Sequence, residues 1–268
     1  MVTFKHVSKV YADGSVAVRD LCLNVSAGEF LVLIGPSGCG KTTTLKMVNR
    51  LIEPTSGELH LFERPAGSWS KVELRRKIGY VIQSVGLLPH LTVAGNIALV
   101  PELLGWPKKK LQQCVDELLQ LGGMDPVTFR GRYPAQLSGG QQQRIGVLRA
   151  LAADPELILM DEPFGALDPI MREQLQLELK NLRQRLKKTI IFVTHDLNEA
   201  LFLADRIVIM KEGAVVQDDT PEGICFNPAD KFVASFVHRA LRSSIPVQIA
   251  TKGQRERAVA VSNRRGRP

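Results

Sequence analysis

The stretch GPSGCGKT, from Gly35 to Thr42, decides the fold of this chain. It fits the pattern GxxxxGK followed by Ser or Thr, and it stands between the apolar run FLVLIG at 30–35 and a helical pattern. Glycines let such a loop turn so tightly that successive backbone N–H groups face phosphate oxygens, and the positive end of the next helix adds attraction. Lys41 is placed to reach the β- and γ-phosphates, and the Thr42 hydroxyl is placed to bind Mg²⁺. The loop therefore predicts a nucleotide site rather than a glycine-rich turn without a ligand.

The rest of the chain supplies the strands and helices that such a loop needs. The opening forty residues mix short β-branched runs with turn signals, which predicts a small antiparallel sheet. Later apolar runs are separated by segments long enough for helical crossovers, which is typical of an α/β fold with a largely parallel sheet. The runs expected to be buried strands are FLVLIG (30–35), IGYVIQ (78–83), LILMDE (157–162), TIIFVTH (189–195) and RIVIMKEG (206–213).

Two segments fall outside this alternation. Residues 84–150 are rich in helix formers, are punctuated by Pro and Gly, and hold no strong strand candidate. We interpret them as a helical subdomain inserted between two strands of the core. Beyond about residue 236 the apolar pattern fades, so 1–236 is assigned to the folded domain and 237–268 to a flexible C-terminal tail.

The bulk composition fits an ordinary globular protein, with 44% hydrophobic and 23% charged residues in 268. The longest apolar runs have the length of strands, well short of the roughly 20 residues of a membrane span, and the N-terminus lacks the apolar core of a signal peptide. Four scattered cysteines without a CxxC pair are typical of free thiols in a reducing cytosol.

The net charge of +8 is concentrated at the C-terminal end. Residues 239–268 hold eight Lys and Arg against Glu256 alone, which leaves the first 238 residues close to neutral. A nearly neutral body argues against a nucleic-acid partner, so none is expected. A basic tail is most often a solvated, disordered segment, and attraction to an anionic membrane surface is the alternative.

Polar side chains end three of the expected strands, at the edge where α/β sheets bind their ligands. We predict that Asp161 helps to hold Mg²⁺ through water, and that Glu162 polarises the water that attacks the γ-phosphorus. His195 is predicted to contact the γ-phosphate, and Gln83 to act as a metal ligand and water sensor. Each of these residues alone fits a structural role, and it is their pairing with the glycine-rich loop that favours catalysis.

The stretch QLSGGQQQR, from Gln136 to Arg144, looks like a second phosphate-binding device. Ser138, Gly139 and Gly140 precede an apparent helix, so a hydroxyl and bare backbone N–H groups are offered to an anion. A stronger phosphate loop already lies about a hundred residues upstream. The residues alone leave open which phosphate the second device reaches.

Together these motifs resemble the ATP-binding subunit of ABC transporters. They occur in that family's order and approximate spacing over roughly residues 1–236, and LSGGQ upstream of the acidic strand is the family's own signature. The resemblance implies ATP and Mg²⁺ as cofactors. It also implies an α/β P-loop NTPase fold with a RecA-like parallel-sheet core, an N-terminal antiparallel β subdomain and an inserted helical subdomain. The residues expected to contact the nucleotide are Tyr11, Gly35, Pro36, Ser37, Gly38, Cys39, Gly40, Lys41, Thr42, Thr43, Ser138, Gly139, Gly140, Gln141 and Asp168.

The resemblance further implies an assembly. Tyr11 would stack on adenine, and Asp168 in GALD would lie at a subunit interface. Two copies would pair head to tail, so that Ser138 of one faces the γ-phosphate bound at Lys41 of the other. Transmembrane permease subunits would dock at 84–106, and a periplasmic or lipid-anchored substrate-binding protein would deliver the solute. The chain would then be a peripheral subunit at the cytoplasmic face of the inner or plasma membrane.

Within the family, the resemblance is strongest to the ATPases of osmoprotectant importers for quaternary amines such as glycine betaine, carnitine and choline. The stretches GPSGCGKTTTLKMVNRLIEPTSGE, VELRRKIGYVIQSVGLLPH and NIALVPELLGW carry it. The expected activity is ATP hydrolysis coupled to import. An importer of another small polar solute, such as an amino acid or a proline-like compound, is the alternative, followed by a non-transport ABC ATPase. Residues 62–70, FERPAGSWS, depart from the acidic turn usual in this group.

Overall fold

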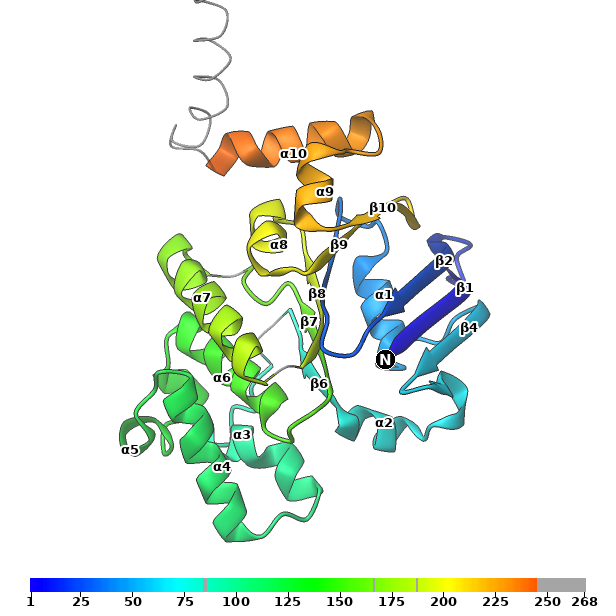
Figure 1. Ribbon diagram of the computed structural model, residues 1–268. Helices are drawn as coiled ribbons and strands as arrows, with labels where there is room; N and C mark the ends of the chain where they lie inside the picture. The colour runs from blue at the N-terminus through cyan, green and yellow to red at the C-terminus, as the bar shows by residue number, and fades with distance from the viewer. Residues whose placement is uncertain (84–85, 166, 187, 245–268) are drawn as a thin grey trace, which may run out of the picture.

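Six strands form the central sheet of the molecule (Figure 1). The computed structural model describes residues 1–83, 86–165, 167–186 and 188–244. In the order β10-β9-β3-β8-β7-β6, neighbouring strands are parallel except for β10 with β9. The five predicted strands are present, and the antiparallel edge strand β10 is an addition to the prediction. The bounds are β3 (Phe30–Ile34), β6 (Ile78–Val81), β7 (Leu157–Asp161), β8 (Thr189–Thr194), β9 (Arg206–Lys211) and β10 (Ala214–Asp219).

This sheet is covered on both faces because its strands are apolar on both faces. Alternate residues of β3 enter different cores: Leu31 and Leu33 pack in the core of helix α1 (Lys41–Val48), whereas Phe30, Val32 and Ile34 face the opposite layer. Figure 1 shows α1 and α7 on opposite sides of the strands. The helices of the opposite layer are α7 (Pro169–Leu186), α8 (Leu197–Leu203), α9 (Pro221–Phe226) and α10 (Lys231–Ser244).

A second, antiparallel sheet packs against α1 in strand order β2-β1-β4-β5. Leu45 and Met47 of α1 share one core with its inward side chains, so the two sheets are joined through this helix. The unusual segment 62–70 belongs to this region: Trp69 is buried, packs edge-on against Phe62, and donates its indole N–H to the carbonyl of Leu61 (3.2 Å). The bounds are β1 (Val2–Val10), β2 (Val16–Val25), β4 (Ser56–Leu61), β5 (Arg64–Pro65), the 3₁₀ turn η1 (Ala66–Ser68) and α2 (Lys71–Lys77).

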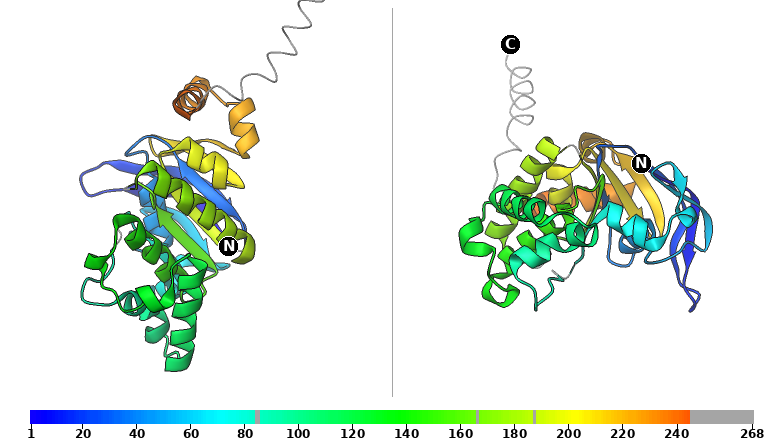
Figure 2. Two further views of the ribbon diagram at one scale, coloured as in Figure 1. Left: turned by 90° about the vertical axis from the view of Figure 1, so that its left-hand side faces the viewer. Right: turned by 90° about the horizontal axis from the view of Figure 1, so that it is seen from below.

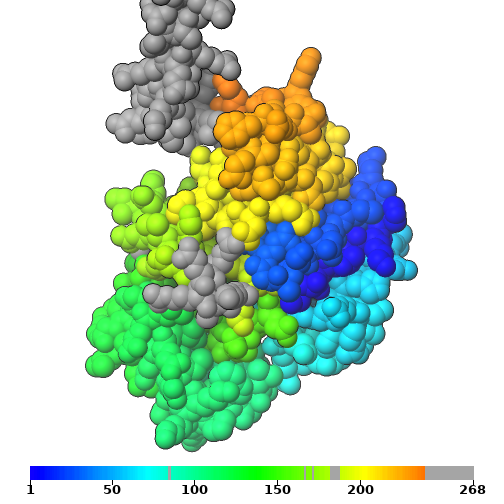
Figure 3. All heavy atoms as spheres, viewed as in Figure 1, coloured from blue at the N-terminus to red at the C-terminus, as the bar shows by residue number. Residues whose placement is uncertain are grey.

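The predicted helical insertion contains only helices and turns in its described part. They enclose a core of their own, which includes Val93, Ile97, Leu119 and Ile145. Seen from below in Figure 2, this subdomain (green) and the antiparallel strands (dark blue) lie on opposite sides of the molecule, and Figure 3 shows the same separation on the surface. The bounds are α3 (Val93–Leu103), α4 (Lys108–Leu121), α5 (Pro126–Phe129), η2 (Pro134–Gln136) and α6 (Gly139–Leu151).

The predicted boundary at residue 236 falls inside a helix. Helix α10 runs to Ser244, and its Val233 and Val237 are buried in the core that also holds α8 and α9. Their spacing of four residues is helical, so the apolar pattern extends past the point where it was expected to fade. Residues 245–268, with most of the basic tail, lie outside the described residues. Among the described helices, none combines the length and the apolar character needed to cross a membrane.

Candidate functional site

The loop at 35–42 wraps around the side chain of Lys41. This side chain is buried, and its ammonium group donates to the carbonyl oxygens of Gly35 (2.7 Å) and Pro36 (2.9 Å). Helix α1 begins directly after Gly40, which offers no side-chain cap to the first-turn N–H groups. Those N–H groups lack partners within a helix and, with the helix dipole, attract an anion. The loop thus places a cation and free backbone donors at one helix N-terminus.

Two glycines of this loop are required by its packing. Gly40 has φ 105°, and a Cβ there would overlap the carbonyl oxygen of Ala17. Gly35 is pressed against the next strand, where a Cβ would overlap the carbonyl oxygen of Met210. The loop therefore owes its shape to close backbone contact with β2 and β9.

The predicted metal ligands Thr42 and Asp161 meet at the carboxyl end of the sheet. The Thr42 hydroxyl donates to the carboxylate of Asp161 over 2.8 Å. Burial raises the pKa of Asp161, an effect that the hydrogen bond from Thr42 opposes. Burial, followed by the charge of Asp161, raises the pKa of the neighbouring Tyr80 to about 12. A cation bound here would offset the cost of burying this carboxylate, so the donor set fits Mg²⁺, which prefers oxygen ligands.

Glu162, Gln83 and His195 converge beside this pair. The Glu162 carboxylate accepts a hydrogen bond from the Gln83 amide (3.4 Å), and the same oxygen lies 3.3 Å from Nδ1 of His195. Glu162 has φ 44°, a left-handed conformation that is uncommon outside glycine, and its N–H donates to the carbonyl of Val193 (2.9 Å). This turn directs the carboxylate away from the line of β7 and towards Gln83 and His195, which follow the ends of β6 and β8.

A buried carboxylate that the sequence analysis missed lies beneath His195. Glu199 of α8 accepts a hydrogen bond from Thr194 (2.6 Å), and burial raises its pKa. The guanidinium of Arg172 lies 3.9 Å from Glu199 and 3.7 Å from Asp196, and it donates to the carbonyl of Leu167. This network links Leu167, the residue before Asp168, to Thr194 and Asp196 on either side of His195. The signal in the sequence was a Glu in the first turn of a helix after THD, which is not distinctive by itself.

The remaining predicted residues fall into two groups. The Tyr11 hydroxyl lies 3.2 Å from that of Thr43, so the aromatic ring stands beside the glycine-rich loop. Ser138 instead caps α6, where its hydroxyl accepts from the N–H of Gln141 and the Gln141 side chain bonds back to the Ser138 N–H. Asp168 caps α7 by accepting from the N–H of Ile170 (3.1 Å). Because α6 packs on the face of the sheet opposite α1, the chain does not bring Ser138 to Lys41.

Comparison with known proteins identifies the family. The family model described as ABC transporter matches residues 18–165, a span that contains Gly35–Thr42, Ser138 and Glu162. The chain belongs to this family. Membership implies ATP binding, and the fold described above is that of an ABC ATPase.

Curated relatives cover most of the chain. It is 60% identical over 237 residues to the carnitine transport ATP-binding protein OpuCA of Listeria monocytogenes, covering 88% of this chain and 59% of that protein. It is 57% identical over 248 residues to the choline transport ATP-binding protein OpuBA of Bacillus subtilis, covering 92% of this chain and 65% of that protein. The chain thus spans about three fifths of the length of these relatives.

A solved structure shares the fold. The ATP-binding cassette MJ0796, in a dimeric post-hydrolysis state bound to ADP and Pi, is 37% identical, with a TM-score of 0.74 over 82% of this chain and 99% of that one.

Proposed function

We propose that the chain is the ATP-hydrolysing subunit of an ABC importer for a quaternary-amine osmoprotectant. The observation that carries this proposal is the convergence of Glu162, Gln83 and His195 beside the Thr42–Asp161 pair, next to the Lys41 loop. Three strands place these groups at one sheet edge, which is the arrangement that phosphoryl transfer to water requires.

Each side chain has a defined task in hydrolysis. Lys41 and the N–H groups that follow it bind the phosphates, and Tyr11 stacks on the adenine. Thr42, Asp161 and Gln83 would hold Mg²⁺, which would neutralise phosphate charge in the transition state. Glu162 accepts the proton of the water whose oxygen attacks the γ-phosphorus, while the bond to the bridging oxygen of ADP breaks. His195 contacts the γ-phosphate and, through its 3.3 Å contact, keeps Glu162 in place.

The site is completed by a second copy of the chain. Ser138 starts α6 on the far side of the sheet from Lys41. It is exposed, and its hydroxyl and its N–H are bonded to Gln141 of the same turn. A head-to-tail pair with two-fold symmetry would bring each Ser138 to the γ-phosphate of the other copy. Dimeric ABC cassettes among the structural neighbours support this pairing.

The membrane partner would dock beside the helical subdomain. A cavity of about 230 Å³ lies between β6, α3 and the end of α6, lined by Tyr80, Leu99, Val100 and Arg149 among others. It adjoins the segment 86–106, the described part of the stretch predicted to receive a permease. The chain would thus be a peripheral subunit at the membrane. The names of the relatives, which transport carnitine and choline, support a quaternary amine as the solute.

The decisive experiment replaces Glu162 by Gln. This variant keeps the size of the side chain and the contacts of Gln83 and His195, but it removes the proton acceptor. Hydrolysis should fall by about 100-fold or more, and ATP should trap a dimer that size-exclusion chromatography detects. A Glu162→Gln protein that stays monomeric with ATP and turns over at the normal rate would refute both the base and the dimer.

The solute is tested separately in the cell of origin. Deletion of the gene should abolish uptake of labelled glycine betaine, carnitine or choline at high osmolarity. A Lys41→Ala copy should fail to restore uptake, whereas the unchanged copy should restore it. If the deletion abolished uptake of an amino acid instead, the solute would be an amino acid and not a quaternary amine. The proposed ATPase activity would still stand.

A further inference from the structure

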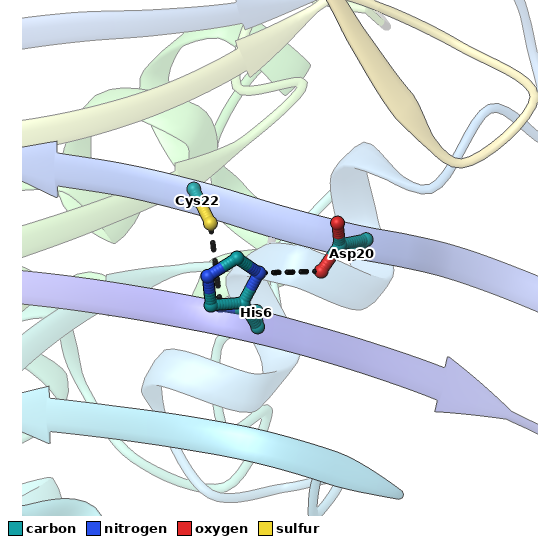
Figure 4. A group of neighbouring side chains, drawn as sticks. All are labelled: His6, Asp20 and Cys22. Atoms are coloured by element: carbon teal, nitrogen blue, oxygen red, sulfur yellow. Dashed lines mark hydrogen bonds and ion pairs between the residues drawn. The ribbon is translucent and has the colours of Figure 1, made fainter.

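A second group of polar side chains lies on the exposed face of the hairpin β1–β2 (Figure 4). It consists of His6 on β1 and of Asp20 and Cys22 on β2. One nitrogen, one carboxylate oxygen and one sulfur lie within 4.8 Å of one another, and Nδ1 of His6 is 2.8 Å from Asp20. Within the described ranges this is the single cluster of three such side chains that could hold a metal ion. None of the three takes part in the nucleotide site.

The backbone is distorted at two of these positions. His6 (φ 50°) and Asp20 (φ 47°) are both left-handed, and the pairing of β1 with β2 shifts register between Phe4 and Val7 and again before Lys9. This conformation is unfavourable for residues other than glycine. Bulges of this kind redirect side chains, and here they bring the three polar groups together.

The surroundings hold this distorted backbone in place. The N–H of His6 donates to Sγ of Cys22 (3.3 Å), and the N–H of Asp20 donates to the hydroxyl of Ser8 (2.9 Å). On the other side, Gly57 packs so closely that a Cβ there would overlap the carbonyl oxygen of His6. The positions of the ligand atoms are therefore set by the fold and not only by rotamers of exposed side chains.

We propose that His6, Asp20 and Cys22 form a binding site for a thiophilic divalent cation, of which Zn²⁺ fits best. Imidazole nitrogen, carboxylate oxygen and thiolate sulfur are zinc ligands, and three protein ligands leave the fourth tetrahedral position to water. Ligand atoms around tetrahedral zinc lie about 3.3–3.6 Å apart, a value bracketed by the 2.8 Å and 4.8 Å of the cluster. The sulfur disfavours Mg²⁺ and Ca²⁺, which take oxygen ligands.

The bound ion would tie β1 to β2. Strand β1 ends at Val10, directly before Tyr11, so the tie would stiffen the hairpin that carries the aromatic ring. Metal binding would release the proton of the Cys22 thiol, because the thiolate is the ligand. The inference concerns a different surface from the nucleotide site, and it stands or falls independently of the proposed ATPase activity.

Cobalt(II) gives a direct test on the full chain, reduced and free of nucleotide. We expect one Co²⁺ per chain with a thiolate-to-cobalt absorption band that Zn²⁺ displaces. Cys22→Ser should abolish the band, while Cys225→Ser, a matched change at another free cysteine, should leave it. His6→Asn and Asp20→Asn should each weaken binding at least about tenfold, and Asn tolerates the left-handed conformation, so that these variants keep the hairpin.

Thermal unfolding gives a second readout. Zn²⁺ should raise the Tm of the unchanged chain and of Cys225→Ser, but not that of Cys22→Ser, because a ligand stabilises only the state that binds it. Ser8→Ala, which removes the acceptor of the Asp20 N–H, should weaken binding about tenfold.

Three results would overturn the site. The first is the lack of a thiolate band in the unchanged chain, and the second is a band that persists in Cys22→Ser. The third is a stoichiometry of half an ion per chain with pairing of chains, which would mean that two copies share the metal.

Discussion

The two glycine segments of this chain, 35–42 and 138–140, differ in what surrounds them. In the first, Lys41 is buried and bonded to its own loop, and a Cβ at Gly40 would overlap the backbone of β2. In the second, a Cβ at Gly139 would meet nothing within 4 Å, and Ser138 is exposed. The chain's own packing therefore requires glycine at Gly40, whereas at Gly139 it leaves room for a side chain.

The comparison shows two different reasons why a position can need glycine. Gly40 serves the fold, because β2 leaves no space for a side chain. Gly139 has space in its own chain, so a need for glycine there would have to come from something that approaches from outside. This contrast agrees with the proposal that the second segment is half of a site completed by another copy.

The largest effect is expected for Gly40→Ala. Overlap with Ala17 and a φ of 105° together should cost about 3–5 kcal/mol of unfolding free energy. Gly139→Ala is the matched control. It should be neutral or stabilise the chain by up to about 1 kcal/mol, because Ala favours a helix over Gly. Urea unfolding followed by circular dichroism measures both, and equal destabilisation would remove the distinction between the segments.

The next effect concerns activity rather than folding. Ser138→Arg should lower ATP hydrolysis by about 100-fold or more, since it removes donors to the transition state. Binding of ATP should change by less than about twofold, because α6 lies on the other face of the sheet from Lys41. Phosphate release and fluorescent-nucleotide binding measure the two quantities. Lys41→Ala is the contrasting variant and should lose binding itself. If Ser138→Arg lost binding as well, the two segments would serve one site within one chain.

A smaller effect is expected at the edge of the first segment. Tyr11→Ala should weaken ATP binding by about 1–3 kcal/mol, the usual value of stacking a base on an aromatic ring. Tyr11→Phe should bind nearly normally, although it loses the 3.2 Å contact with Thr43. Isothermal titration with ATP compares them. An equal loss in both variants would assign the effect to the hydroxyl and not to stacking.

The smallest effect is expected at Glu199, a buried carboxylate whose hydrogen-bond partner Thr194 lies in the same chain. Burial raises the pKa of Glu199 above its ordinary value of 4.5, so the folded state binds this proton more tightly than the unfolded state. The stability gained by protonation is complete below pH 4.5 and is lost as the pH rises through the folded pKa. At pH 7, Glu199→Gln should therefore stabilise the chain by about 1 kcal/mol, and the gain should shrink towards pH 5. Denaturant unfolding at both pH values checks the sign, and a gain that grows at pH 5 would contradict it.

Much of the fold could be predicted because its signals are local. The run FLVLIG, which ends at Gly35, marks a buried strand, and all five such runs lie in the six-stranded central sheet. Strand β10 was not predicted because Ala214–Asp219 is mostly half-exposed and polar at its end, so it lacks the continuous apolar run of the other strands. The end of the domain was placed too early, since the apolar spacing of Val233 and Val237 is diluted by exposed neighbours.

The site shows the same limit. The sequence predicted that Gln83, Glu162 and His195 meet, because parallel strands bring their carboxyl ends to one edge. It did not indicate Glu199 or Arg172, whose roles depend on how α7 and α8 pack under His195. Nor did it indicate the left-handed turn at Glu162 or the cluster at His6, because backbone distortion at ordinary residues has no distinctive pattern in the sequence.

Helix α6 belongs to two cores at once. Its last turn, with Ala150 and Leu151, is anchored against the sheet, while Ile145 and Leu148 lie in the separate core of the helical subdomain. Its 13 residues make an arm about 20 Å long. A tilt of about 10° around the anchored end would carry Ser138 by about 3 Å, more than the tolerance of a hydrogen bond. In the proposed assembly, a tilt of this size, caused by a membrane partner bound at the helical subdomain, would make or break the contact of Ser138 with the phosphate.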